Sequence, residues 1–261
     1  MKMLIFFDID GTLIDENTHT IPESAVRAIK RARENGHRCV INTGRSRKLV
    51  RKEMFPGMEF DGFVMGCGTM IVYGGKVLLH KTFTKEEAHR ILDGLYRYRI
   101  DAVLEGGTDN FRDCDERIFT DVFRNFIHRF DALDYRSYEE APGRFDKFYC
   151  YAQTGENMSC FLREYADLLD CVDRGGGFYE MTPKGFSKAG SMKLLAEQIG
   201  DPNLRIAAIG DSTNDIAMLR AADIGIAMGN ATAEVKAAAD YVTATVEEDG
   251  IERALKWLKV I

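Results

Sequence analysis

The chain has 261 residues, 45% of them hydrophobic and 29% charged, so it is long enough for one large core or for two domains. Its net charge of −6 argues against a general binding surface for nucleic acids or anionic membranes. The six cysteines form no C-x-x-C pair and the five histidines are scattered, so neither a disulfide framework nor a zinc cluster is expected. With no apolar run of membrane-spanning or signal-sequence length, we expect a cytoplasmic protein, and no obligate protein partner is implied.

The first predicted element is a buried strand over residues 4–7 that ends in two acids, Asp8 and Asp10. Residues i and i+2 of a strand face the same way, so both carboxylates can address one site. An Asp-Gly pair by itself is an ordinary turn. Two acids at the end of a buried strand, however, repel each other and lose hydration. This arrangement therefore indicates a cation and a reaction.

Along the first third of the chain, apolar strands alternate with amphipathic helices, which is typical of a parallel α/β sheet. Thr20 is expected to cap the first helix, with Pro22 and Glu23 following it. The expected elements are a strand at 4–7, a helix from 20 to 35, a strand at 38–42, a helix through 54, a strand at 63–65 and a hairpin over 71–79.

A second capping box at Thr84 begins a region with a looser rhythm. Strands are expected at 102–105, 145–151 and 178–181, and helices at 118–127 and 157–169. The α/β rhythm returns at Ser187, with strands at 206–209, 224–228 and 241–243 between helices. We therefore expect a doubly wound, mostly parallel, Rossmann-like core formed by residues 1–83 and 184–261, with an inserted α+β domain at 84–183.

Four polar motifs mark strand ends or helix starts of this core: D-x-D-G-T from Asp8, N-T-G-R around Thr43, S-K at Lys188, and G-D-S-T-N-D around Asp211. Ligands of open α/β sheets bind outside the carboxyl ends of the strands, where helix N-termini attract anions. Singly, each motif has an ordinary alternative: Thr43 and Asp211 can cap helices, and most helix lysines are solvated. Their joint occurrence favours a single site.

In this order the four motifs resemble those of the haloacid dehalogenase-like phosphatase superfamily. Residues 224–231 and 238–243 are similar to the Cof-like group of its class IIB, whose members are mostly hydrolases of sugar phosphates or other small phosphomonoesters with an α/β cap. One departure is Cys67-Gly68-Thr69, where many relatives have Asn-Gly-Ala. Without a paired His or second Cys, Cys67 is more typical of a packing residue than of a nucleophile.

The resemblance implies an Mg²⁺-dependent reaction on a small phosphorylated metabolite. Asp8 would be the nucleophile that forms an aspartyl phosphate, and Asp10 the general acid and base. The metal would be held by the carboxylates of Asp8 and Asp211 and by the Asp10 carbonyl. Asp215 would orient these ligands or Lys188. The transferring oxygens would be bound by Lys188, Thr43, Gly44 and Asn214.

Two alternatives stay open at this point. A sugar phosphomutase or phosphotransferase would use the same core motifs and return the phosphoryl group to a second hydroxyl. A non-catalytic phosphometabolite-binding protein is disfavoured by the acids at 8, 10, 211 and 215, which gain nothing by facing a phosphate. The motifs do not specify the substrate, and Glu180, close to the end of the insertion, is a candidate residue for selecting it.

Overall fold

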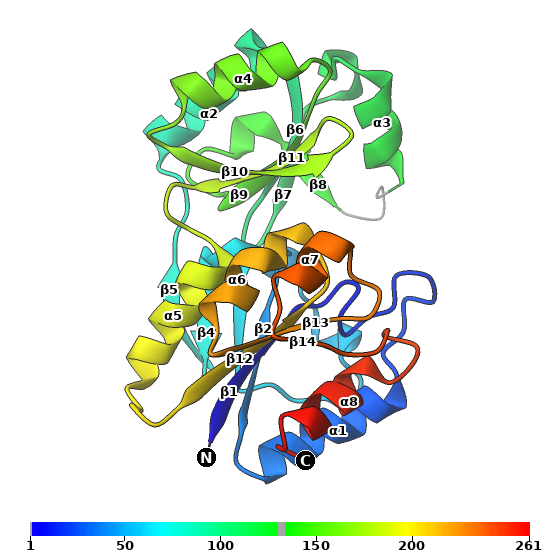
Figure 1. Ribbon diagram of the computed structural model, residues 1–261. Coiled ribbons are helices and arrows are strands. Elements are labelled where there is room, and N and C mark those ends of the chain that lie inside the picture. The colour runs from blue at the N-terminus through cyan, green and yellow to red at the C-terminus, as the bar shows by residue number, and fades with distance from the viewer. Residues whose placement is uncertain (1, 130–133) are drawn as a thin grey trace. The chain divides into compact units, whose positions relative to one another are not determined.

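The computed structural model describes residues 2–129 and 134–261. The chain divides into two compact units, each with its own sheet (Figure 1). The core unit comprises Met1–Gly44, Val50–Leu79 and Ser187–Ile261, and the inserted unit comprises Arg45–Leu49 and His80–Phe186.

The core unit contains an eight-stranded sheet in the order β14-β13-β12-β1-β2-β3-β4-β5. Neighbouring strands from β14 to β3 run parallel, and β4 is antiparallel to β3. The strands are β1 (Met3–Phe7), β2 (Arg38–Asn42), β3 (Gly62–Met65), β4 (Met70–Tyr73), β5 (Lys76–His80), β12 (Arg205–Gly210), β13 (Ile224–Ala227) and β14 (Tyr241–Val242). The predicted doubly wound, mostly parallel α/β class is confirmed.

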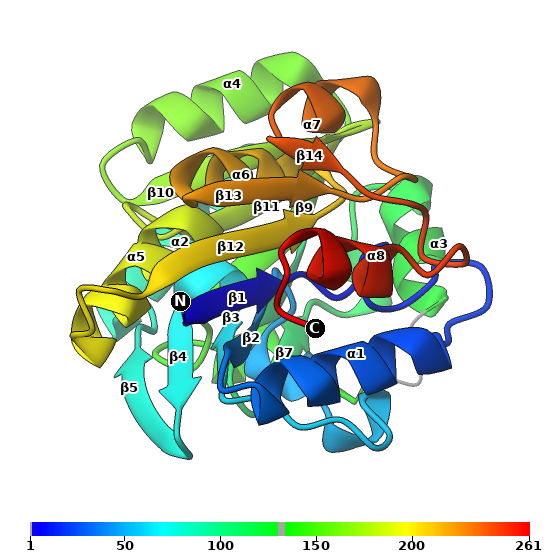
Figure 2. The same cartoon turned by 60° about the horizontal axis from the view of Figure 1, so that its bottom comes forward.

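Helices cover both faces of this sheet (Figure 2). They are α1 (Glu23–Glu34) and α8 (Gly250–Trp257) on one face, and α5 (Lys188–Ile199), α6 (Ile216–Ala221) and α7 (Ala233–Ala237) on the other. The alternation of β1 explains its wholly apolar sequence: Ile5 and Phe7 pack in the cluster with α1 and α8, whereas Leu4 and Phe6 pack in the cluster with α5 and α6.

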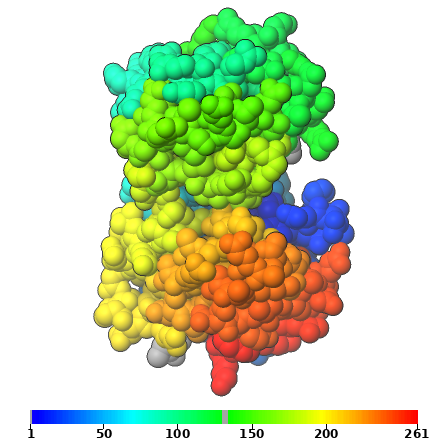
Figure 3. Space-filling view, turned by 45° about the horizontal axis from the view of Figure 1, so that its top comes forward, coloured from blue at the N-terminus to red at the C-terminus, as the bar shows by residue number. Residues whose placement is uncertain are grey.

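The inserted unit contains a six-stranded sheet in the order β10-β11-β9-β6-β7-β8. Its strands are β6 (Ile100–Glu105), β7 (Asn110–Arg112), β8 (Tyr135–Ser137), β9 (Lys147–Ala152), β10 (Leu169–Gly175) and β11 (Phe178–Pro183). Helices α2 (Lys85–Arg97) and α4 (Gly155–Glu164) share one apolar cluster, and α3 (Asp121–His128) packs in another around Val103. Arg97 of α2 binds Glu164 of α4 at 2.7 Å, and Figure 3 shows the two helices in space-filling form.

Two sequence-based expectations about helices and their caps are wrong, and one is confirmed. Thr20 does not cap α1, because the helix begins after Pro22 and has no side-chain cap. Residues 45–54 form no α-helix but two short 3-10 turns, Arg47–Leu49 and Lys52–Met54. Basic side chains four residues apart along the segment 45–54 repel each other and destabilise an α-helix in it. The predicted capping box of α2 is present, since Thr84 accepts from the Glu87 N–H at 3.1 Å.

The helix expected at 157–169 ends instead at Glu164, and β10 begins at Leu169. Strand β10 pairs with β11 along six register positions, so sheet pairing overrides the local preference of this segment. None of the helices in residues 2–129 and 134–261 is long and apolar enough to cross a membrane.

Candidate active site

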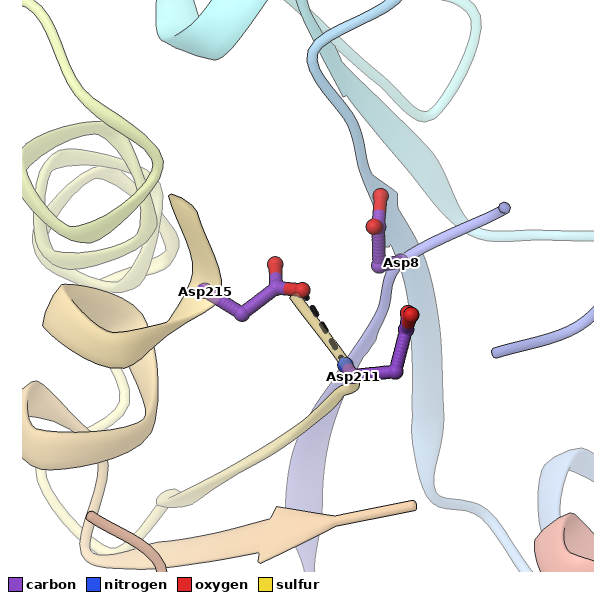
Figure 4. A group of neighbouring side chains, drawn as sticks. All are labelled: Asp8, Asp211 and Asp215. Carbon is purple, nitrogen blue, oxygen red and sulfur yellow. Dashed lines mark hydrogen bonds between the residues drawn. The ribbon is translucent and has the colours of Figure 1, made fainter. Parts of the chain in front are cut away.

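Asp8 and Asp211 follow neighbouring parallel strands of the core sheet at their carboxyl ends. Strand β1 pairs with β12 so that Phe7 lies opposite Ile209, and the Asp8 N–H donates to the Ile209 carbonyl at 3.0 Å. Figure 4 shows the two carboxylates next to each other, with Asp215 projecting toward them from the start of α6. The topology of the sheet therefore joins the first and the fourth motif.

The turn after Asp8 is shaped by glycine and closes over Asp211. Gly11 has a φ of +70°, and a Cβ atom at this position would lie 2.2 Å from Asp211 Oδ2. The next residue, Thr12, is fully buried and donates its hydroxyl to Asp211 Oδ1 at 2.8 Å. The D-G-T part of the motif thus has a packing reason: glycine allows the approach, and threonine orients the carboxylate.

Asp10 lies in the same turn and is half-buried. The turn is held by backbone hydrogen bonds, including one from the Gly11 N–H to the Ile14 carbonyl at 2.9 Å. From the loop after β13, the Asn230 side-chain amide donates to the Gly11 carbonyl at 2.8 Å. Gly11, the residue after Asp10, is therefore held through both its N–H and its carbonyl.

Lys188 connects the acids of the site. Ser187 caps α5 and accepts from the Gly190 N–H at 3.1 Å, so Lys188 occupies the first helical position. Its ammonium nitrogen lies 2.9 Å from Asp8 Oδ1 and 2.7 Å from Asp215 Oδ1. It also donates to Asn214 Oδ1 at 3.3 Å. Only 2% of Lys188 is exposed, so this is a buried ion network and not a solvated helix lysine.

Asp215 is fully buried and both of its oxygens are engaged. Oδ1 binds Lys188, while Oδ2 accepts from the backbone N–H groups of Asp211 at 3.1 Å and Ser212 at 3.0 Å. Charge-assisted bonds of this kind favour a fixed carboxylate. Asp215 therefore orients both Lys188 and the backbone that carries Asp211.

Burial and neighbouring charges shift the pKa values of Asp8, Asp211 and Lys188. Desolvation, followed by the charge of Asp215, raises the pKa of Asp8 to about 8. Desolvation also raises the pKa of Asp211 to about 7, although the hydrogen bond from Thr12 lowers this pKa. Burial alone would lower the pKa of Lys188, but Asp215 and Asp8 outweigh it, so the pKa lies above its usual range. Acids with raised pKa values need a positive charge beside them to stay ionised at neutral pH.

The donor set fits a hard divalent cation. Asp8, Asp211 and Asp215 each offer a carboxylate oxygen, and these oxygens lie within 4.8 Å of one another. Mg²⁺ prefers oxygen ligands and is usually held by one or two carboxylates together with water and substrate oxygens. Because Asp215 is already engaged on both oxygens, Asp8 and Asp211 are the carboxylates best suited to a metal.

Thr43 and Gly44 follow β2, which lies beside β1, so they are at the same edge of the sheet. Thr43 is buried, and its backbone N–H donates to the Val64 carbonyl at 2.9 Å. Its carbonyl accepts from the Cys67 N–H at 3.1 Å. Cys67 is buried in a left-handed conformation, with a φ of 55°.

The sequence profile of the haloacid dehalogenase-like hydrolase family matches residues 5–255, nearly the whole chain. The chain belongs to this family. All four motifs lie within the match, and structural neighbours include subclass IIB members of the superfamily, which confirms the resemblance to the Cof-like group.

Relatives that match over nearly their full length include several phosphatases. Phosphatase YwpJ of Bacillus subtilis is 27% identical, with 98% of this chain and 99% of that protein covered. The 5-amino-6-(5-phospho-D-ribitylamino)uracil phosphatase YitU of the same organism is 28% identical, with 97% and 96% covered. A solved subclass IIB sugar phosphatase is 28% identical, covers both chains completely and superposes with a TM-score of 0.80. This hydrolase-family chain is accordingly a phosphatase.

Sequence reasoning overlooked three residues that position the site of this phosphatase. Thr12 orients Asp211, and Asn230 holds the Gly11 carbonyl. Asn42, fully buried at the end of β2, donates to the Lys188 carbonyl at 3.1 Å. All three lie in or beside the motifs, but their roles depend on partners far away in the sequence.

Proposed function

We propose that this phosphatase is an Mg²⁺-dependent phosphomonoester hydrolase that acts on small phosphorylated metabolites, chiefly sugar phosphates, through an aspartyl phosphate on Asp8. One observation supports this most strongly: Asp8 lies 2.9 Å from the Lys188 ammonium and also has an oxygen in the acid cluster with Asp211. A carboxylate placed between a buried cation and a metal-type site is suited to attack a phosphate dianion.

In this proposal the metal is held by the carboxylates of Asp8 and Asp211 and by the backbone carbonyl of Asp10. A bound Mg²⁺ would offset the repulsion between the attacking carboxylate and the phosphate dianion. Thr12 and the Gly11 turn keep Asp211 in place for this role.

In the proposed reaction Asp8 accepts the phosphoryl group and Asp10 transfers the protons. A carboxylate oxygen of Asp8 attacks phosphorus, the bond to the leaving alcohol oxygen breaks, and Asp10 gives that oxygen its proton. Asp10 then takes a proton from a water that attacks the phosphorus of the aspartyl phosphate. Inorganic phosphate leaves, and the Asp8 carboxylate is restored. Asp10 lies in the turn next to Asp8, and the held Gly11 peptide supports its position.

Phosphate oxygens are proposed to bind Lys188, the Thr43 hydroxyl, the Gly44 N–H and Asn214. Lys188 supplies a full positive charge in a buried setting, where charge stabilisation of the transferring group is strongest. Asp215 keeps that ammonium oriented, which explains why its oxygens are committed to Lys188 and to backbone N–H groups.

We further propose that residues 84–183 act as a cap that selects the leaving group. Similar proteins include a sugar phosphatase and a phosphatase of a ribityl-bearing phosphate, and both leaving groups are rich in hydroxyls. This supports polyol and sugar phosphates as the first substrates to examine.

A panel of phosphorylated metabolites with Mg²⁺, ranked by kcat/KM, tests the function. Release of inorganic phosphate in stoichiometric amounts with the free alcohol supports a hydrolase. Conversion of a hexose phosphate into an isomeric hexose phosphate would identify a phosphomutase instead. Absence of turnover of every ester, p-nitrophenyl phosphate included, in folded protein with Mg²⁺ would contradict any phosphatase role.

A further inference from the structure

The loop after β3 contacts both segments that are proposed to bind phosphate. The Cys67 N–H donates to the Thr43 carbonyl at 3.1 Å. The carbonyl of the next residue, Gly68, accepts from the Ser191 hydroxyl of α5 at 3.1 Å. Ser191 lies three residues after Lys188, about one turn into this helix. All of these residues belong to the core unit, so the loop connects Thr43 to the helix that carries Lys188.

Glycine allows this loop to approach α5 closely. Gly68 has a φ of +99°, and a Cβ atom at this position would lie 1.9 Å from Ser191 Oγ and 2.9 Å from the Ser187 carbonyl oxygen. Thr69 is fully buried and donates its hydroxyl to the Gly66 carbonyl at 3.1 Å, which closes the turn. The N-terminus of α5 is therefore packed directly against the loop.

Asn42 makes a second connection between the same two segments. It is the residue before Thr43, and its side-chain amide donates to the Lys188 carbonyl at 3.1 Å. A carbonyl in the first turn of a helix already accepts from the N–H four residues further along. The bond from Asn42 is thus additional to those that the helix itself requires.

The oxygen of the Asn42 side chain indicates that stability is not the reason for an amide at this position. Asn42 is fully buried, yet its Oδ1 has no hydrogen-bond partner among the described residues. An unpaired buried acceptor costs free energy, which an apolar side chain of similar size would avoid. A comparable bond elsewhere in the unit lacks this cost, because Asn35 is exposed while its amide donates to the Val260 carbonyl at 2.7 Å. The amide at position 42 is therefore explained by what it positions.

We propose that Asn42 and Ser191 are positioning residues that fix the spacing between Thr43 and Lys188, and with it the phosphate-binding half of the active site. The inference rests on the proposed function, in which Thr43 and Lys188 bind oxygens of the transferring phosphoryl group. Such groups stabilise a transition state best when they are already placed where its charge develops. The two bonds to α5 hold this arrangement before a substrate binds.

The proposed metal ligands have separate supports. Thr12 orients Asp211, and Asn230 holds the carbonyl of Gly11, the residue after Asp10. Loss of a connection in the phosphate-binding half should therefore weaken the binding of phosphate analogues more than the binding of Mg²⁺.

Orthovanadate, which forms a five-coordinate analogue of the transferring phosphoryl group, measures this effect in the full chain with Mg²⁺. Asn42→Ala and Ser191→Ala should each raise the vanadate inhibition constant about five- to tenfold and lower kcat/KM for p-nitrophenyl phosphate by the same factor. The Mg²⁺ concentration that gives half-maximal activity should stay the same. Ser191→Ala provides the test if Asn42→Ala does not fold.

Two control variants remove similar bonds from other parts of the core unit. Asn35→Ala removes the amide bond to Val260, and Thr243→Val removes a buried hydroxyl that donates to the Gly250 carbonyl at 2.7 Å. Both should lower Tm without altering the vanadate inhibition constant. If they alter it as much as the two test variants do, loss of stability explains the effect and the proposal fails. It also fails if the test variants raise the half-maximal Mg²⁺ concentration as much as the vanadate inhibition constant.

Direct binding separates this inference from the proposed function. Inorganic phosphate is titrated by calorimetry into the unmodified chain and into Asn42→Ala or Ser191→Ala, with Mg²⁺ present. If no ester is hydrolysed but phosphate binds and the substitutions weaken its binding, the hydrolase proposal fails and the positioning role stands. If esters are hydrolysed but vanadate inhibits the unmodified protein and the folded variants equally, the positioning role fails alone. Absence of both turnover and phosphate binding would overturn both.

Discussion

The side-chain amide of Asn230 donates a hydrogen bond of 2.8 Å to the carbonyl of Gly11, across 219 positions of the sequence. Gly11 is the residue after Asp10 and packs against Asp211. One contact thus ties the loop after β13 to the turn that carries the proposed acid/base. It makes Asn230 a positioning residue whose effect can be measured.

Asn230→Ala should leave the fold intact and lower kcat/KM about tenfold, because the Gly11 peptide loses a hydrogen bond worth about 1 kcal/mol. The loss should appear in kcat and in the apparent affinity for Mg²⁺, since both depend on this turn. Steady-state kinetics over a range of Mg²⁺ concentrations measure it. Asn203→Ala, at an exposed loop position, is the control. Equal kinetics in the two variants would show that the contact does not position the turn.

Gly11→Ala should be far more damaging. A Cβ atom there would lie 2.2 Å from Asp211 Oδ2, so the carboxylate or the turn must move. Displacement of a reacting group by about 1 Å can cost about 10²-fold in rate, and we expect at least that loss of kcat/KM. Gly74→Ala separates the clash from backbone strain, because Gly74 has a φ of +55° with no atom within 4 Å of the added Cβ. A loss of similar size in that variant would rule out the clash as the cause.

Replacement of the two acids of the first motif should have different effects. Asp8→Asn removes the nucleophile, so every substrate should fail. Asp10→Asn withdraws the proton that a sugar alkoxide needs, at a cost of about 10²–10⁴-fold, whereas p-nitrophenolate leaves with little help. The phosphoenzyme also loses its base, so rapid mixing should show a burst of nitrophenol followed by slow turnover. If there is no burst and both substrates lose activity equally, Asp10 is not the acid/base.

Mg²⁺ should support turnover and Ca²⁺ should inhibit it. Ca²⁺ is larger and takes more oxygens, so it can engage both oxygens of Asp8 and occupy the one that attacks. The measurement is phosphate release with each ion after treatment with chelator. Equal rates with the two ions, or full activity in chelator, would contradict the proposed metal site.

The affinity for Mg²⁺ should rise with pH. Burial raises the pKa of Asp211 to about 7 and that of Asp8 to about 8, so below these values an ion must displace protons. The association constant should then increase about tenfold per pH unit for each displaced proton and level off above pH 8.

The metal-free protein should show the opposite trend. The folded state holds protons that the unfolded state, with aspartate pKa values near 3.8, has already released. Its stability should therefore fall as the pH rises from about 4 to about 8. Thermal unfolding at several pH values, with and without Mg²⁺, measures both trends. An Mg²⁺-induced increase in Tm that is the same at pH 5.5 and pH 8 would show that the acids do not bind the ion.

Most of the core could be predicted because its signals are local. Apolar runs such as residues 4–7 depend on alternation along a strand, and in the inserted unit the predicted cap at Thr84 depends on neighbours within one turn. Predictions failed where a distant partner decides the structure. Strand pairing ends α4 early and creates β10. The helix expected through residue 54 is wrong for a local reason instead, because like charges four residues apart destabilise a helix in this segment.

The sequence by itself determined which chemical groups are present and in which order: the acids at 8 and 10, the lysine at 188 and the acids at 211 and 215. Only the tertiary structure decided that Lys188 lies between Asp8 and Asp215 and that Asn230 holds Gly11. These contacts depend on strand register and on chain segments that are 27 to 219 positions apart, and no local pattern encodes such pairings.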